Sequence, residues 1–253
     1  LSDLFCKGII PKIYFLSISL NKKLTNHDWL SKFKKILYKD QKKFNVFLGG
    51  GDTTYSSKLS ITITVLGQSK KKPILRKGSM NDDDIYVTGN IGDSYLGLSV
   101  LKKNKNFNKL NKYFKKKYLE PDIPSWISPY LSKIASSSID ISDGLAQDLQ
   151  HLCNNSKKGA FINLDLLPIS SHSSKLIKNK KIKLKNFFSK GDDYQILFTS
   201  NKKNRSLIQS LLIKKKGKVS KIGHITKGKK IIFEYKGQKF KLNAKNMGYK
   251  HNF

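Results

Sequence analysis

The sequence predicts a two-domain α/β fold, with one domain at about residues 1–74 and the other at about 75–253. Its 253 residues exceed the length of an average domain, about 100 to 150 residues. Apolar residues recur with the period of strands in some segments and of helices in others, and the two patterns alternate along the chain. Residues 68–83 lack strong periodicity and carry Pro73 and Gly78, so we expect the domain junction there.

The N-terminal part is expected to contain three strands and one helix. Alternating apolar residues predict a strand at 12–20. Apolar residues at helical spacing predict a helix over 26–39, with Asn26 as its cap. A strand at 44–48, a glycine turn at 49–54 and a strand at 59–67 are expected to follow.

The C-terminal part continues the alternation of strands and helices. Further strands are predicted at 84–89, 137–142, 160–166, 193–199, 218–223 and 230–235. Further helices are predicted from Gly92 and Asp93 onward and at about 107–118, 125–135, 143–152 and 205–215. The acidic run at 81–84 is expected to form a surface turn.

The composition is strongly basic, with 50 Lys and Arg against 17 Asp and Glu and a formal charge of +33. Such a charge can signal nucleic-acid or membrane-surface binding. However, Arg76 and Arg205 are the only arginines, and arginine is the side chain best suited to phosphate and base contacts. The lysines are spread through nearly every segment, which indicates a solvated basic surface. We therefore expect no dedicated nucleic-acid partner, and keep a catalytically inert polyanion-binding protein as an alternative.

Cysteine usage and hydropathy predict a cytoplasmic location. Cys6 and Cys153 are far apart in sequence and form no metal or disulfide motif. The most apolar early stretch, residues 9–20, is interrupted by Pro11 and Lys12 and is too short to cross a bilayer. We expect no membrane partner. Because residue 1 is Leu, the chain is also expected to be an N-terminally truncated piece of a longer product.

The stretch "SIDISDGLAQDLQHL" at 138–152 gathers carboxylates in a basic chain. Asp140, Ser142 and Asp143 fall at a strand-to-helix turn, where ligands bind in open α/β sheets. A carboxylate at the end of a buried strand requires a cationic partner, so Asp140 favours a metal site. Asp143 could instead cap the helix. Asp148 could equally face solvent.

Two glycine-associated acidic segments extend this interpretation. Asp52 follows Gly51 in "GGGDTT", which alone could also be a plain hairpin turn. Asp192 and Asp193 follow Gly191, although adjacent carboxylates on a turn are often merely solvated. Single carboxylates on separate loops are typical of magnesium–nucleotide sites, because Mg²⁺ binds one or two carboxylates together with substrate phosphates.

Several motifs occur in an order that is more specific than any one of them. They are "LSDL" (1–4), "GGDTT" (50–54), "LRKG" (75–78), "DIYVTG" (84–89), "GDSYLGL" (92–98), "SIDISDGLAQDLQHL" (138–152), "GDDYQILFT" (191–199) and "GYKHNF" (248–253). This series resembles the thiamine-monophosphate kinases of the aminoimidazole ribonucleotide synthetase superfamily. The resemblance implies that superfamily's two-domain architecture, with an incomplete N-terminal domain here.

The resemblance also implies an activity and partners. These are ATP-dependent phosphorylation of thiamine monophosphate to thiamine diphosphate, magnesium and potassium as cofactors, and a homodimer paired through N-terminal strands. Direct transfer between phosphate oxygens requires alignment and charge neutralisation rather than a strong general base. Selenophosphate synthetase, another ATP-using member of the superfamily, is the alternative within this class.

Site residues follow from the resemblance, position by position. The implied metal ligands are Asp3, Asp52, Asp140 and Asp143. The implied nucleotide contacts are Gly51, Asp52, Arg76 and Ser142. The implied contacts to thiamine phosphate are Asp192 and Tyr249. Three departures from the family pattern stand near the last motif: Lys190 replaces a usual glycine, Asp192 a usual Glu, and Gln195 another usual Glu.

Overall fold

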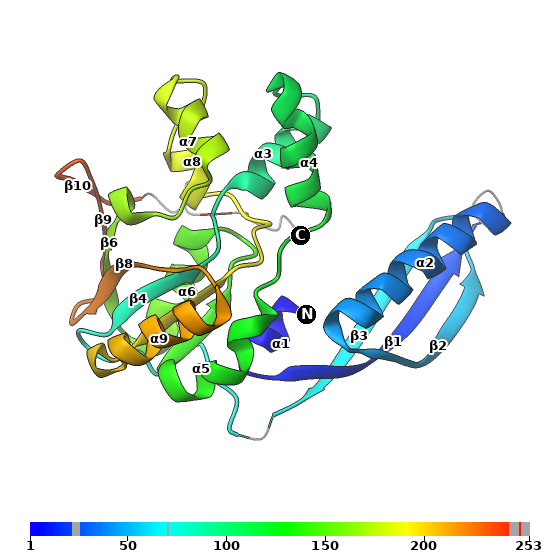
Figure 1. Cartoon of the computed structure of the whole chain (residues 1–253), viewed down its shortest axis with the longest axis horizontal. Coiled ribbons are helices and arrows are strands. Elements are labelled where there is room, and N and C mark those ends of the chain that lie inside the picture. Colours follow the sequence, from blue (N-terminus) through cyan, green and yellow to red (C-terminus); the bar gives the residue numbers. More distant parts are fainter. Residues whose placement is uncertain (22–25, 70, 243–247, 249–253) are drawn as a thin grey trace.

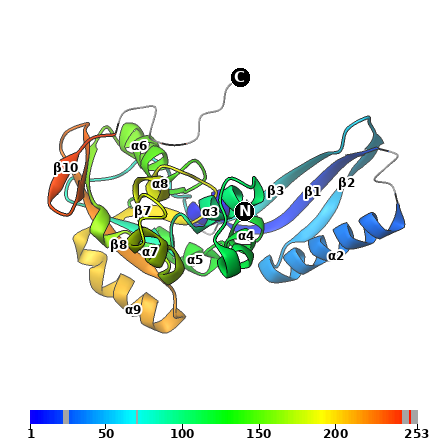
Figure 2. The same cartoon turned by 90° about the horizontal axis from the view of Figure 1, so that it is seen from above.

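Two separate β-sheets organise the chain. The structure is a computed structural model that describes residues 1–21, 26–69, 71–242 and 248. One sheet has three strands in the order β2-β1-β3, and the other has seven in the order β10-β9-β6-β8-β4-β7-β5. Figure 1 shows the small sheet with helix α2 on the right and the larger body on the left, and Figure 2 shows the same separation from above. The predicted mixture of helices and strands is confirmed.

A helix packs against the central strand of the three-stranded sheet. β1 (Ile10–Leu20) pairs in parallel with β2 (Phe47–Tyr55) and antiparallel with β3 (Ser60–Gln68). α2 (His27–Phe44) begins after Asn26, whose side chain accepts the Trp29 N–H, so the predicted cap is confirmed. The Gln41 side chain donates to the Tyr14 hydroxyl, so α2 covers the face of β1 that carries Tyr14 and the buried Ile18.

The predicted glycine turn at 49–54 is wrong, because β2 continues straight through it. In the register of the sheet, Leu16 pairs with Gly51 and Ser17 with Asp52. A Cβ on Gly51 would lie 1.8 Å from the Leu16 carbonyl oxygen, so glycine permits the close approach of two strands. Asp52 shares the face of Ser17, which is opposite to the face that α2 covers.

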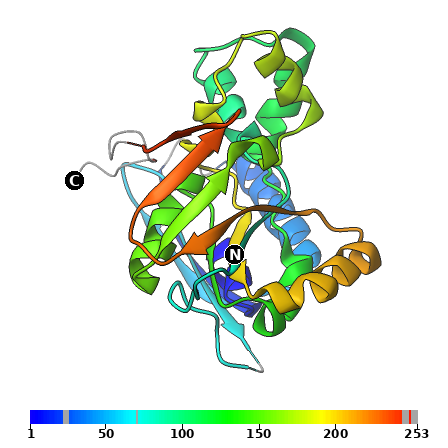
Figure 3. The ribbon, with the colours of Figure 1, turned by 90° about the vertical axis from the view of Figure 1, so that its left-hand side faces the viewer.

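The seven-stranded sheet forms the larger body, which Figure 3 shows with the small sheet behind it. Its strands are β4 (Asp84–Thr88), β5 (Ser137–Asp140), β6 (Gly159–Asn163), β7 (Ile196–Ser200), β8 (Val219–Thr226), β9 (Ile231–Tyr235) and β10 (Gln238–Phe240). Neighbouring strands are antiparallel, apart from the parallel pair of β6 and β9. Strand β5, which ends at Asp140, is an edge strand of this sheet.

Helices cover both faces of the larger sheet. They are α1 (Ser2–Cys6), α3 (Asp93–Leu101), α4 (Asn111–Leu119), α5 (Ser128–Ile134), α6 (Leu145–Ser156), α7 (Ser171–Lys178), α8 (Lys185–Phe188) and α9 (Arg205–Lys215). Ile85 and Val87 of β4 join a core with α3, α4, α6, α7 and α8, whereas Tyr86 joins a core with α1, α5 and α9. The alternation of side chains along β4 therefore supplies two cores, one on each face.

Some boundaries differ from expectation. The strand predicted at 160–166 ends at Asn163 and continues as a 3₁₀ turn, and the strand predicted at 193–199 starts at Ile196. The acidic run at 81–84 is not wholly on the surface, because Asp83 and Asp84 are buried. Helix α1, which was not predicted, packs Phe5 into the core beside Tyr86. The domain division at 1–74 and 75–253 stays a prediction.

Candidate active site

The turn after β5 brings together segments that are distant in sequence. Asp140 is 3% exposed, and one carboxylate oxygen accepts the Ser2 hydroxyl at 2.8 Å. Burial and the nearby Asp3 charge raise the pKa of Asp140, while Ser2 and the Arg76 charge oppose that rise. The predicted residues Asp3, Arg76 and Asp140 are thus electrostatic neighbours.

Asp148 shapes this turn. It is 2% exposed, so it does not face solvent. Its Oδ2 accepts the backbone N–H groups of Ser142, Asp143 and Gly144 at 3.1, 3.2 and 3.1 Å. These amides are therefore not free to bind a phosphate, as those at a helix start often are.

Asp143 does not cap helix α6, so that expectation is wrong. The cap position is Gly144, with φ of 127°, and no side chain caps it. The Asp143 carboxylate instead accepts a hydrogen bond from Gln147 Nε2 at 3.0 Å. Asp143 is only half-buried, which leaves it accessible to a ligand.

The turn has the chemistry of a cation site. Burial and the charges of Asp143 and Asp140 raise the pKa of Asp148 to about 7, although its hydrogen bonds with backbone amides oppose the rise. Carboxylates at such close quarters repel one another unless a cation or a proton intervenes. The residues present therefore fit a cation such as Mg²⁺. Ligand atoms of Asp143, Asp148 and the exposed His151 also lie within 4.8 Å of one another.

A cavity of about 690 Å³ opens beside this turn. Its lining includes Ser142 and Asp143 of the acidic turn together with Asp192. The remaining lining residues are Tyr95, Leu98, Ser99, Lys102, Asn104, Tyr118, Lys190, Gly191 and Tyr194. The cavity thus combines aromatic rings, two lysines and two carboxylates. The sequence did not identify the tyrosines from α3 and α4, because nothing local distinguishes them from core aromatics.

Asp192 is tied directly to the acidic turn. Its N–H donates to the Ser142 carbonyl at 2.9 Å, and its φ is 69°. A Cβ on Gly191 would lie 1.9 Å from the same carbonyl oxygen, so the two turns are packed closely. Burial raises the pKa of Asp192, and a hydrogen bond from Tyr194 opposes the rise.

The neighbouring Asp193 is buried rather than solvated. Both of its carboxylate oxygens accept the Gly92 N–H, at 3.0 and 2.9 Å, which holds the start of α3. Gln195 accepts the Thr88 hydroxyl at 2.9 Å and donates to the Asp122 carbonyl at 2.7 Å. The hydrogen bonds of Asp193 and Gln195 therefore hold in place the segment that carries Asp192.

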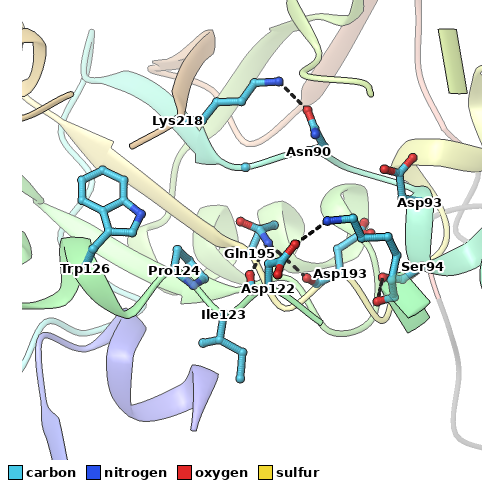
Figure 4. Close-up of a pocket in the computed structure, with 12 residues that line it drawn as sticks. Asn90, Asp93, Ser94, Asp122, Ile123, Pro124, Trp126, Asp193, Gln195 and Lys218 are labelled. Atoms are coloured by element: carbon cyan, nitrogen blue, oxygen red, sulfur yellow. Dashed lines mark hydrogen bonds and ion pairs between the residues drawn. The ribbon is translucent and has the colours of Figure 1, made fainter. Parts of the chain in front are cut away.

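A second cavity of about 290 Å³ lies on that side (Figure 4). Two pairs of its polar side chains bond each other: Lys218 donates to Asn90 (Figure 4), and Lys117 donates to Asp122. Both lysines of this cavity therefore already have partners. The larger cavity, which borders the acidic turn, is consequently the candidate substrate site.

The remaining predicted residues lie elsewhere. Gly51 and Asp52 are exposed on β2, and among the described residues neither cavity has them in its lining. Tyr249 lies outside the described residues. A Cβ on the described Gly248 would lie 2.9 Å from the Asp143 carbonyl oxygen, so the chain passes the acidic turn directly before Tyr249.

Comparison with known proteins defines the class first. A family model described as AIR synthase related protein, N-terminal domain, matches residues 1–69. A solved structure described as AaThiL complexed with AMPPCP and TMP superposes with a TM-score of 0.85 at 25% identity, covering 99% of this chain and 77% of that one. The chain therefore has the AIR synthase-related fold.

Sequence relatives narrow the class to one family. The thiamine-monophosphate kinase of Buchnera aphidicola subsp. Acyrthosiphon pisum is 41% identical over 262 residues, which cover 94% of this chain and 76% of the relative. The crystal structure of thiamine-monophosphate kinase from Stenotrophomonas maltophilia K279a has a TM-score of 0.84 at 26% identity, covering 94% of this chain and 75% of that one. The chain belongs to the thiamine-monophosphate kinase family.

Proposed function

We propose that this protein transfers the terminal phosphoryl group of ATP to thiamine monophosphate and so forms thiamine diphosphate. One observation carries the proposal: Ser142 and Asp143 belong both to the acidic turn and to the lining of the large cavity. An acceptor in the cavity would present its phosphate to a nucleotide held at the turn. The relatives named as thiamine-monophosphate kinases support this function over that of selenophosphate synthetase.

The cavity suits the acceptor. Thiamine carries a cationic thiazolium ring, and cations are attracted to aromatic faces and to carboxylates. Tyr95, Tyr118 and Tyr194 supply aromatic rings, and Asp192 supplies a carboxylate. We assign these residues, together with the family position Tyr249, to the thiamine end of the substrate. Lys102 and Lys190 add positive charge to the same cavity.

The chain's own part in catalysis is positioning. Asp140 and Asp143 would hold Mg²⁺, which would supply neutralisation of the charge on the phosphates. Ser142, at the border of the two regions, orients the nucleotide toward the acceptor phosphate. A phosphate oxygen already bears negative charge at neutral pH, so no side chain needs to remove a proton from it. We extend the proposal to Asp3 as a further magnesium ligand, to Arg76 as a nucleotide contact, and to potassium as a second cofactor.

We also propose a homodimer. β2 is exposed along its whole length and β3 along nearly all of it, and the face opposite α2 carries Phe15, which is 40% exposed. An open sheet with unpaired edges is a ready surface for pairing with another chain. Gly51 and Asp52 lie on this sheet, so a partner that covers it would enclose the proposed nucleotide contacts.

We propose no membrane partner and no dedicated nucleic-acid partner. Among the described residues, no helix combines the length and the apolar character that a membrane span needs. A cytoplasmic location is part of the proposal and is supported by Cys6 and Cys153, which are buried free thiols. The basic surface is proposed to bind polyanions only loosely. Binding that weakens steeply with salt in a protein without ATP turnover would favour the inert alternative.

The direct test is a coupled assay. The chain is incubated with ATP, Mg²⁺ and thiamine monophosphate, and thiamine diphosphate is measured by chromatography. We expect product only when all three are present, and none after chelation of Mg²⁺. Selenide with ATP serves as the competing substrate, and turnover there alone would overturn the proposal.

A further inference from the structure

We propose that Asp148 is a positioning residue that fixes the magnesium turn and the substrate turn relative to each other. This inference rests on the proposed function. Asp148 has no predicted contact with nucleotide or substrate. Its role would be to hold the backbone from which Asp143 and Asp192 project.

The first turn depends on one carboxylate oxygen. Asp148 Oδ2 accepts three successive N–H groups, those of Ser142, Asp143 and Gly144. Gly144 has no side chain to cap the helix, so this carboxylate satisfies amides that would otherwise lack partners. Asp148 therefore determines the path of the turn on which Asp143 stands.

The second turn, which carries Asp192, is hydrogen-bonded to the first. The carbonyl of Ser142 accepts the Asp192 N–H at 2.9 Å, and the carbonyl of Ile141 accepts the Tyr194 N–H at 2.8 Å. Ser142 is thus bound from both sides, through its N–H by Asp148 and through its carbonyl by Asp192. A shift of residues 141–144 would displace Asp192 within the cavity.

The anchor of Asp148 is independent of the turn. Helix α6 buries Leu145, Leu149 and Leu152 completely in the core. These contacts should keep the helix in place when the Asp148 side chain is removed. Loss of Asp148 should then loosen the two turns more than it unfolds the protein.

A matched control exists in Asp83. It is also buried, at 1% exposure, and its Oδ2 accepts the Met80 N–H at 2.9 Å. It lies before β4 and lines neither of the cavities described above. Asp83→Ala removes a buried carboxylate bonded to a backbone amide without touching the site, so it reports the cost to stability alone.

The experiment compares wild type, Asp148→Ala, Asp148→Asn and Asp83→Ala. Each is titrated with Mg²⁺ and with thiamine monophosphate in the kinase assay, and Mn²⁺ binding is measured by electron paramagnetic resonance with a non-hydrolysable ATP analogue. For Asp148→Ala we expect three values to rise at least tenfold: the Mg²⁺ concentration for half-maximal activity, the Mn²⁺ dissociation constant and the KM for thiamine monophosphate. Loss of a residue that supports metal ligands typically costs about 10- to 100-fold in metal affinity or activity. Asp148→Asn, which keeps an acceptor oxygen, should fall between wild type and Asp148→Ala. Asp83→Ala should lower the unfolding temperature but leave these constants within twofold of wild type.

The same measurements can also contradict the proposed role of Asp148. A folded Asp148→Ala variant with all three constants within twofold of wild type overturns the proposal, as does a rise matched by Asp83→Ala. If Asp148→Ala does not fold, Asp148→Asn decides through hydrogen exchange: faster exchange of the amides of residues 142–144 supports the role, and wild-type exchange refutes it. Should wild type make no thiamine diphosphate, the proposed function fails, while Mn²⁺ binding and hydrogen exchange still decide the role of Asp148.

Discussion

The Ser2 hydroxyl donates a 2.8 Å hydrogen bond to the Asp140 carboxylate, across 138 residues of sequence. Both residues are buried, so the start of α1 and the end of β5 are joined inside the protein. Asp3 follows directly and adds its charge to the surroundings of Asp140. Two predicted metal ligands from opposite parts of the chain therefore lie at one place.

This convergence makes a clear prediction for Asp140→Asn. The change keeps the shape and the acceptor for Ser2 but removes charge, so Mg²⁺ should bind less well and turnover should fall about 100- to 1,000-fold. Asp143→Asn should behave alike. The measurement is thiamine diphosphate formation as a function of Mg²⁺ concentration. The control is Asp165→Asn. Asp165 lies in the turn after β6, and its carboxylate accepts the Lys236 N–H. Near-normal rates for both site variants would exclude them as metal ligands.

Substitution of Asp192 should affect the acceptor more than the nucleotide. Asp192→Asn removes negative charge beside the three cavity tyrosines, and we expect the KM for thiamine monophosphate to rise about tenfold, roughly the loss of one charge-assisted contact. The KM for ATP should change much less. Initial rates over both substrate concentrations separate the two constants, with the exposed Asp82→Asn as control. An equal rise in both KM values would contradict the proposal that Asp192 contacts the thiamine end of the substrate.

The sequence predicted those parts of the site that depend on local pattern. Strand alternation before Asp140 and helical spacing after Gly144 placed the acidic turn between β5 and α6. Local pattern did not reveal the role of Asp148. At the first turn of a helix a side chain can point outward or back toward the turn, and only the buried backbone amides decide which.

Long-range pairing explains the other differences. A glycine run is compatible both with a turn and with close contact between strands. Gly51 belongs to the second kind, because the Leu16 carbonyl of β1 lies directly against it. The acidic run at 81–84 looks like a surface turn until Arg205, 121 residues away, is brought against Asp84. Helix α1 has only five residues, too few for a periodic pattern.

The open three-stranded sheet predicts the oligomeric state. Wild type should sediment at twice the 28.8 kDa chain mass. Phe15 and Thr64 are register partners on the face that α2 does not cover. Phe15→Lys with Thr64→Lys should give a folded monomer, because lysines on this face oppose burial against a partner. Ile213→Lys, on the 73% exposed side chain of α9, is the control. A monomeric wild type, or a dimer that persists in the double variant, would contradict the proposed interface.

Asp84 provides a prediction about stability at low pH. It is 1% exposed, and its carboxylate accepts Arg205 Nε at 2.5 Å and Arg205 Nη2 at 2.8 Å, with Lys221 Nζ at 3.3 Å. Burial alone would raise the pKa of Asp84, but Arg205 and Lys221 outweigh burial and lower it. The ionised carboxylate is therefore favoured more in the folded protein than in the unfolded chain.

The sign of the pH dependence follows. A carboxyl group with a lowered pKa in the folded state stabilises the fold above its unfolded pKa, about 3.9, and loses that contribution as the pH falls further. Asp84→Asn should lower the free energy of unfolding by about 2 kcal/mol at pH 7, the size of a charge-assisted hydrogen bond. The difference from wild type should shrink below about pH 4, where wild type becomes protonated as well. Urea unfolding from pH 3 to 7 measures both values, and the exposed Asp82→Asn should show neither effect. A difference that stays constant down to pH 3 would mean that packing, rather than the ion pair with Arg205, accounts for the loss.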